Sequence, residues 1–123
     1  MKDDEKHEPA EVYDNSRFDS NGDYICCVYG IYLKSRDALF YVGATVDLYR
    51  IALQHQSYMS NVTRKDYHRK LYVNMRLNDW DDYEFRILER ITYMDTKHLN
   101  GRKNYYIKEL DPLYNSSRGR HMY

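Results

Sequence analysis

The alternation of apolar and polar residues along the chain predicts three strands. Two apolar runs rich in aromatic residues, at 24–34 and 39–45, are typical of strands, and the short polar link between them predicts a β-hairpin. A third strand is expected at 83–91, where apolar and polar residues alternate. The pattern therefore predicts a small antiparallel sheet.

Helical spacing appears in three further segments. Asp47 is a suitable N-cap, and after it one helical face carries Leu48, Ile51, Ala52 and His55. A second helix is expected at 68–77. A third is expected at 96–110, and Pro112 ends it because proline disfavours helix in the residue before it. The order ββ-α-α-β-α predicts an α+β domain whose three-stranded antiparallel sheet is flanked by helices.

Charge divides the 123-residue chain into two parts. Residues 1–23 carry eight acidic and three basic side chains, and because the whole chain is neutral, residues 24–123 have an excess of five positive charges. The acidic segment predicts a poorly ordered leader, and the basic remainder predicts one domain able to meet a polyanion. A solvated tail on an ordinary surface explains the same charges equally well.

Cys26 and Cys27 are the only cysteines. Neighbouring strand residues point to opposite faces, so these two are poorly placed to form a disulfide with each other. They are expected to be small core residues of a reduced, intracellular, soluble protein. No apolar run approaches the ~20 residues of a membrane span, so no membrane partner is expected.

Two motifs in the predicted hairpin point to a family. Gly30-Ile31-Tyr32 and Tyr41-Val42-Gly43 lie one in each strand, and together with the helix after Asp47 and the segment 104–115 they resemble the GIY-YIG nucleases. The resemblance covers about residues 28–115. It implies the GIY-YIG fold and a Mg²⁺- or Mn²⁺-dependent endonuclease that hydrolyses phosphodiester bonds of DNA, double-stranded rather than single-stranded. The likeness to compact phage-type members suggests a phage or viral protein of the host cytoplasm.

The resemblance also implies a set of active-site residues. Tyr32 would contact the attacking water, Tyr41 would help to place the phosphate, and His55 would stand on the helix after the hairpin. Asn115 would pack against the active site. His68 lies where some phage-type members have a second active-site histidine, although an exposed histidine at a helix start is an equally good explanation.

Two positions depart from the family pattern. Ile51 stands four residues before His55, where the family has an arginine, and Arg50 lies about 100° away around the helix. Lys103 stands where the family has its metal-binding glutamate, and an ammonium group repels Mg²⁺. Glu109, six positions further on, points elsewhere. We therefore expect this chain to bind neither Mg²⁺ nor Mn²⁺ and to be catalytically impaired, with Tyr32, Tyr41, His55 and Lys103 sharing one concave surface.

Basic side chains supply candidate contacts to the phosphate backbone, namely Arg50, Arg64, Lys65, Arg69, Lys70, Arg118 and Arg120. Each alone is more often a solvated surface charge, and only together do they make a DNA-binding surface as good an explanation. The leading hypothesis is an impaired GIY-YIG endonuclease, and the alternative is a catalytically inactive nucleic-acid-binding module. A protein-interaction domain that uses its surface tyrosines is a third possibility.

Overall fold

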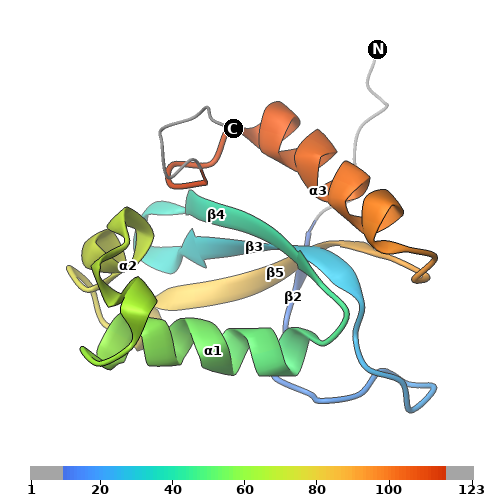
Figure 1. Cartoon of the computed structure of the whole chain (residues 1–123), viewed down its shortest axis with the longest axis horizontal. Coiled ribbons are helices and arrows are strands. Elements are labelled where there is room, and N and C mark those ends of the chain that lie inside the picture. The colour runs from blue at the N-terminus through green and yellow to red at the C-terminus, as the bar shows by residue number, and fades with distance from the viewer. Residues whose placement is uncertain (1–9, 116–123) are drawn as a thin grey trace.

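A four-stranded antiparallel sheet organises the chain, with helices on both of its faces (Figure 1). The computed structural model describes residues 10–115. The strands are ordered β2-β5-β3-β4, with α1 and α2 on one face and α3 on the other. The α+β class is confirmed, and the sheet has one strand more than predicted.

The hairpin and the third predicted strand form the centre of the sheet. β3 (Cys27–Leu33) pairs with β4 (Ala38–Thr45) on one side and with β5 (Tyr83–Arg90) on the other. A 3₁₀ turn, η1 (Lys34–Arg36), closes the hairpin. Because β3 is covered on both faces, nearly all of its side chains are buried, which explains an apolar run without clear alternation.

The additional strand, β2 (Glu11–Val12), comes from the segment predicted to be a poorly ordered leader. It pairs with β5, and the side chain of Arg90 donates two hydrogen bonds to the carboxylate of Glu11, at 3.0 and 2.6 Å. Tyr13 follows it and is buried. Residues 11–13 thus pair with β5 instead of belonging to a poorly ordered leader, while the acidic side chains of residues 10–23 stay mostly exposed. Residues 1–9 lie outside the described residues.

The helices begin close to their predicted positions. The Asp47 carboxylate accepts a hydrogen bond from the backbone N–H of Arg50, at 3.3 Å, and caps α1 (Leu48–Ser60). α3 (Thr96–Leu110) is capped by Asp95, whose carboxylate accepts a hydrogen bond from the backbone N–H of His98 at 2.7 Å. The middle helix, α2 (Lys70–Met75), is shorter than predicted because η2 (Lys65–His68), a 3₁₀ turn, precedes it. A further 3₁₀ turn, η3 (Trp80–Asp82), leads into β5.

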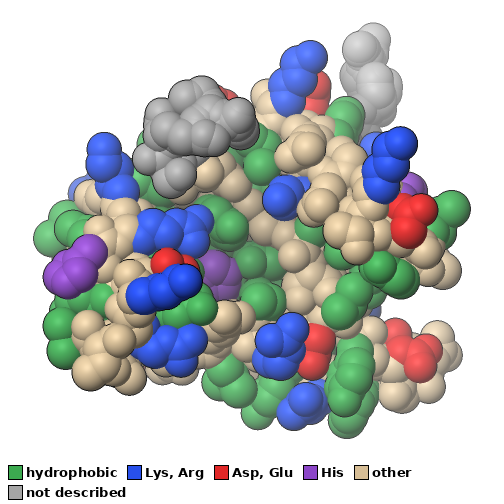
Figure 2. All heavy atoms as spheres, viewed as in Figure 1, with side chains coloured by type: hydrophobic (Ala, Val, Ile, Leu, Met, Phe, Trp, Pro, Cys, Tyr) green, Lys and Arg blue, Asp and Glu red, His purple; other side chains and the backbone are tan. Residues whose placement is uncertain are grey.

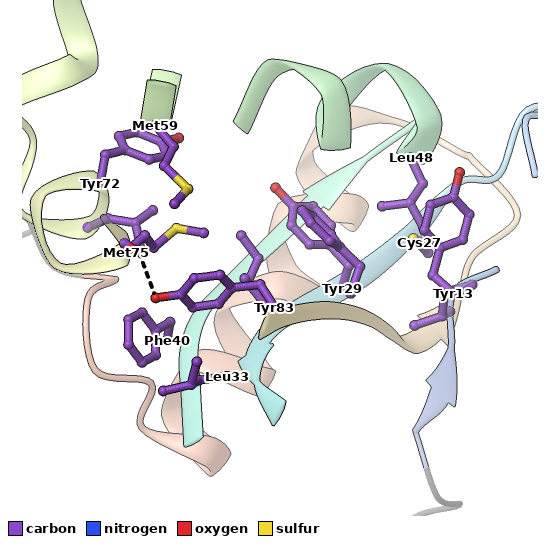
Figure 3. Packing of buried hydrophobic residues seen from close by; sticks show 14 of the residues in the cluster. Tyr13, Cys27, Tyr29, Leu33, Phe40, Leu48, Met59, Tyr72, Met75 and Tyr83 are labelled. Carbon is purple, nitrogen blue, oxygen red and sulfur yellow. Dashed lines mark hydrogen bonds between the residues drawn. The ribbon is translucent and has the colours of Figure 1, made fainter. Parts of the chain in front are cut away.

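Two apolar clusters hold the helices on the sheet. The larger one packs α1 and α2 against β3 and β5, and within it the hydroxyl of Tyr83 donates to the Met75 carbonyl at 3.0 Å (Figure 3). The smaller cluster places Leu99 and Tyr106 of α3 on the opposite face. Cys26 and Cys27 are both free thiols, and Cys27 is fully buried. Within residues 10–115, no helix is long and apolar enough to cross a membrane.

Candidate active site

A cavity of about 270 Å³ opens beside the edge strand β4. Side chains reach it from both faces of the sheet, because α1 and the η2–α2 segment contribute from one face and α3 contributes from the other. Its lining residues are Tyr29, Tyr41, Ala44, Ile51, Gln54, His55, Tyr58, Asp66, Arg69, Tyr72 and Lys103. Small-molecule pockets typically have ~300–1,000 Å³, so a cavity of this size suits a group such as a phosphate better than a large cofactor.

His55 lies at the base of this cavity and is held by two tyrosine hydroxyls. Its Nε2 atom is 2.8 Å from the hydroxyl of Tyr29, and its Nδ1 atom is 2.7 Å from the hydroxyl of Tyr72. The Tyr41 ring completes the group, with its centroid 5.5 Å from the imidazole. Side chains from three elements, β3, β4 and α2, thus converge on one buried histidine of α1.

This histidine is neutral. Burial, and then the nearby charge of Arg69, lowers the pKa of His55 from 6.5 to about 3. A neutral imidazole has one donor and one acceptor nitrogen, so one of its two tyrosine partners donates to it and the other accepts from it. Burial likewise raises the pKa of Tyr29 well above its ordinary value of 10.0, and Tyr29 is therefore a neutral phenol.

Gly43 leaves the space that the Tyr29 hydroxyl occupies. A Cβ atom at Gly43 would overlap that hydroxyl and would lie only 2.9 Å from the Cε1 atom of Tyr29. The glycine of the Tyr41-Val42-Gly43 motif therefore has a steric function: it allows the buried phenol to reach His55 across the neighbouring strand.

The prediction that Tyr32 belongs to the site is wrong. Side chains alternate along β3, and Tyr29 packs in the cluster beneath α1 and α2, as do Ile31 and Leu33. Tyr32 therefore points to the opposite face, where the guanidinium of Arg86 lies 3.9 Å from its ring centroid. Tyr29, which was not predicted, occupies the place expected for Tyr32.

Tyr41 lines the cavity, and a β-bulge is the physical reason. Opposite β3, Ile31 pairs with Tyr41 and Tyr32 pairs with Leu39, so Phe40 is an extra residue in β4. As a result the neighbouring side chains of Phe40 and Tyr41 both pack on the face that holds α1 and α2. The Tyr41 ring centroid lies 6.4 Å from that of Tyr29.

The two positions that were expected to depart from the family pattern, Ile51 and Lys103, both line the cavity. Ile51 is half-buried on α1, one helical turn before His55, and Lys103 is half-buried on α3. Arg50 is exposed and does not line the cavity. Arg69 does line it: its guanidinium carbon lies 5.4 Å from the Tyr41 ring centroid and 5.6 Å from that of Tyr72. The cavity therefore contains an arginine, supplied by the segment before α2 rather than by α1.

The residues present do not fit a divalent cation. Asp66 is the one carboxylate among the lining residues, and it is outnumbered there by Arg69 and Lys103. Across residues 10–115, no group of three or more His, Cys, Asp and Glu side chains is placed to hold a metal ion. Glu109 is exposed and does not line the cavity. Mg²⁺ prefers oxygen ligands in a net negative site, whereas this cavity is net positive.

Asn115 does not line the cavity and instead binds the backbone of β4. The N–H of Val42 donates to its side-chain oxygen and its side-chain amide donates to the Val42 carbonyl, both at 2.7 Å. The preceding residues continue this pairing, because the N–H groups of Leu113 and Tyr114 donate to the carbonyls of Leu39 and Phe40. The segment thus covers the outer edge of β4 next to Tyr41.

His68 is exposed and does not line the cavity, and its ring packs edge-on against Tyr67 with centroids 5.1 Å apart. The structure thus favours the explanation of an exposed histidine. Among the predicted basic contacts, Arg64 lies at the rim, with its guanidinium carbon 4.4 Å from the ring centroid of Tyr58, while Lys65 and Lys70 are exposed. Arg118 and Arg120 lie outside the described residues.

Sequence patterns gave no sign that three residues line the cavity, namely Asp66, Arg69 and Tyr72. All three come from the η2–α2 segment, which has no motif of its own, and Arg69 was expected only as a surface contact. The periodicity of α2 would have marked Tyr72 as buried beside Leu71 and Met75. Nothing in the sequence shows that its hydroxyl reaches His55.

Comparison with known proteins identifies the fold of this chain. No protein-family model and no curated protein sequence matches the chain. Among solved structures, the catalytic domain of homing endonuclease I-TevI is similar with a TM-score of 0.60 and 24% identity, covering 73% of this chain and 96% of that domain. A mutant of bacteriophage T4 EndoII is similar with a TM-score of 0.54 and 18% identity, covering 87% of this chain and 92% of that one. Both neighbours are GIY-YIG proteins, and this chain has the GIY-YIG nuclease fold.

Proposed function

We propose that this chain is a GIY-YIG endonuclease domain that binds DNA through the cavity around His55, and that its metal-dependent hydrolysis is impaired. The observation that supports this most directly is the composition of that one cavity. It retains two tyrosines on adjacent strands and a histidine on the next helix, yet Ile51 and Lys103 also line it. The likeness to two nuclease structures makes DNA the natural partner.

The positive charge around the cavity supports binding to a backbone. Lys and Arg side chains gather over α2 and around the hollow beside it (Figure 2). Arg64, Arg69 and Lys103 lie at or in the cavity, and Lys65 and Lys70 extend the basic surface from η2 into α2. Such contacts fix a phosphate backbone without reading its sequence, so the proposal specifies DNA but no target site.

The same geometry makes hydrolysis depend on a bound cation. Both nitrogens of His55 are already engaged by tyrosine hydroxyls, so the imidazole has no free nitrogen with which to take a proton from water. Any proton must pass through Tyr29 or Tyr72, and burial raises the pKa of each phenol. Without a cation-binding carboxylate in place of Lys103, the residues that line the cavity offer no site for the divalent cation that would lower the pKa of an attacking water most strongly.

A catalytically inactive nucleic-acid-binding module is the second candidate, and Lys103 favours it. An ammonium group in place of a carboxylate disfavours metal binding but attracts phosphate. A cavity of this kind can therefore bind DNA without cleaving it.

Two measurements on the unaltered chain test the proposal. Fluorescence anisotropy with labelled duplex DNA should show binding that weakens steeply as salt is raised. Incubation of the same DNA with Mg²⁺ or Mn²⁺ should give little or no cleavage. If the duplex is not bound even at low salt, the DNA-binding proposal is wrong, whereas rapid metal-dependent cleavage would leave binding intact and refute the impairment.

A further inference from the structure

Arg69 differs from five other arginines of residues 10–115 in what holds it, whereas Arg64 resembles it, because its guanidinium also lies over a tyrosine ring. Arg17, Arg86, Arg90 and Arg102 each pair with a carboxylate, and Arg76 donates to two backbone carbonyls. Within residues 10–115, no carboxylate lies within 4.0 Å of the Arg69 guanidinium. Its guanidinium instead lies near two aromatic rings, those of Tyr41 and Tyr72. The charge is therefore positioned without being neutralised.

The guanidinium stays charged although it is partly buried. Burial alone would lower the pKa of Arg69, but the oxygens of Tyr41, Tyr72 and Asp66 outweigh this effect and the pKa is raised. A guanidinium that is stacked on aromatic rings and weakly hydrated loses little when it meets an anion. A cationic donor with no carboxylate partner, directed into a small cavity, is suited to an anionic ligand.

Lys103 approaches the same cavity from the other side of the sheet. It comes from α3, whereas Arg69 comes from the segment before α2, and the edge strand β4 runs between these two elements. Against the single carboxylate of Asp66, these two cations leave the cavity with a net positive charge. A phosphate oxygen placed there would meet a planar guanidinium fork on one side and an ammonium point charge on the other.

We propose that Arg69 is the phosphate-binding arginine of this cavity, and that Arg69 and Lys103 together hold a backbone phosphate without a divalent cation. This inference rests on the proposed DNA-binding function and assigns its chemistry to two residues. In this chain the arginine role has moved from position 51 on α1 to position 69, and a lysine has taken the place of the metal.

The test is DNA binding in EDTA, measured by fluorescence anisotropy of a labelled duplex at several salt concentrations. Removing a cation that contacts one phosphate should reduce the slope of log affinity against log salt by about 1. We expect Arg69→Ala and Lys103→Ala each to reduce affinity roughly tenfold, in line with the loss of one charge-assisted contact. Arg36→Ala and Lys97→Ala remove the same charges from exposed positions outside the cavity and should change affinity by less than about threefold.

A rescue variant separates a binding role from a structural one. Ile51→Arg, introduced into the Arg69→Ala chain, returns a guanidinium to the cavity from α1 and should recover most of the lost affinity. Circular dichroism and thermal unfolding of each variant should show that the fold is kept. If Arg69→Ala does not fold, Arg69→Gln takes its place, because glutamine retains most of the side-chain volume.

The outcomes are distinguishable. If the unaltered chain fails to bind duplex DNA under any condition, the proposed function itself fails. If it binds only when Mg²⁺ is added, or if Arg69→Ala and Arg36→Ala weaken binding equally, the DNA-binding proposal stands and the assignment of a metal-free phosphate site to Arg69 and Lys103 is wrong.

Discussion

The hydroxyl of Tyr29 lies 2.8 Å from Nε2 of His55. This contact joins β3 to α1 inside the core and makes Tyr29, rather than Tyr32, the partner of Tyr41. Val28-Tyr29-Gly30 is thus the segment that supplies the tyrosine of the first strand, and Gly43 on the neighbouring strand provides its space. The site depends on one buried polar contact that a substitution can remove cleanly.

Tyr29→Phe should therefore destabilise the fold, whereas Tyr32→Phe should not. The first change leaves a buried imidazole nitrogen without its partner, at a cost of about 1–3 kcal/mol. The second removes a hydroxyl from a half-buried ring that contacts Arg86 through its face, and this contact survives in phenylalanine. Urea unfolding of both variants measures the difference. Equal stability of the two variants would contradict the assignment of Tyr29.

The tyrosine was misassigned because β3 has no polar face. Its residues are buried on both sides, so the sequence offers two tyrosines, one on either side of Gly30, and no alternation to choose between them. The bulge at Phe40 makes it harder still to predict which tyrosine of β3 lies on the same face as Tyr41, because it shifts the register between β3 and β4 by one residue. In contrast, α1 was predictable, since its cap at Asp47 and the periodicity of its apolar face are both local.

Acid should destabilise this protein through His55. Burial lowers the pKa of His55 from 6.5 to about 3, so as pH falls the unfolded chain takes up a proton before the folded chain does. The stabilisation is complete above pH 6.5 and is lost progressively as pH falls toward 3. The loss approaches about 1.4 kcal/mol for each pH unit in this window.

Urea unfolding of His55→Gln beside the unaltered chain isolates this effect from the carboxylates. Glutamine keeps hydrogen-bonding groups but does not titrate, so between about pH 6.5 and about pH 5 the variant should lose roughly 2 kcal/mol less than the unaltered chain. His68→Gln, at an exposed position, should retain the full dependence. Parallel curves for the unaltered chain and His55→Gln would show that His55 is not held in its neutral form.

Gly43→Ala and Gly101→Ala should change stability in opposite directions. A methyl group at Gly43 overlaps the Tyr29 hydroxyl, so it must displace a ring that is packed on all sides, at a cost of about 1–3 kcal/mol. At Gly101, on exposed α3, a Cβ atom meets nothing within 4 Å, and alanine should stabilise the helix by about 0.8–1.0 kcal/mol. Thermal unfolding of both variants measures whether each substitution lowers or raises the stability. If Gly43→Ala leaves the stability unchanged, Tyr29 does not need this space.

Arg69 and β2 show where prediction from the sequence ends. Arg69 precedes a helix of six residues and belongs to no repeating pattern, so only the folded chain shows that it reaches the cavity. β2 has two residues in an acidic segment, and its pairing depends on the edge of β5 being available. The position of Arg69 and the pairing of β2 both depend on contacts between residues that are distant in sequence. Composition and periodicity predict only local structure.

A carboxylate in place of Lys103 should allow cleavage of DNA. Arg69, which already lines the cavity, should set the rate of that cleavage. Lys103→Glu changes the local charge by two units and supplies an oxygen ligand for Mg²⁺. Because Arg69 already lines the cavity, this change alone should give weak Mg²⁺-dependent cleavage of duplex DNA, and Ile51→Arg alone should give none. The combination Ile51→Arg with Lys103→Glu should cleave fastest, since one preorganised cationic contact contributes about 10²- to 10³-fold to a rate.

Adding His55→Ala should abolish the cleavage, which distinguishes it from a contaminating nuclease. If the double variant binds both DNA and Mg²⁺ yet cleaves nothing, the cavity is better described as a phosphate-binding site that has kept the shape of a nuclease.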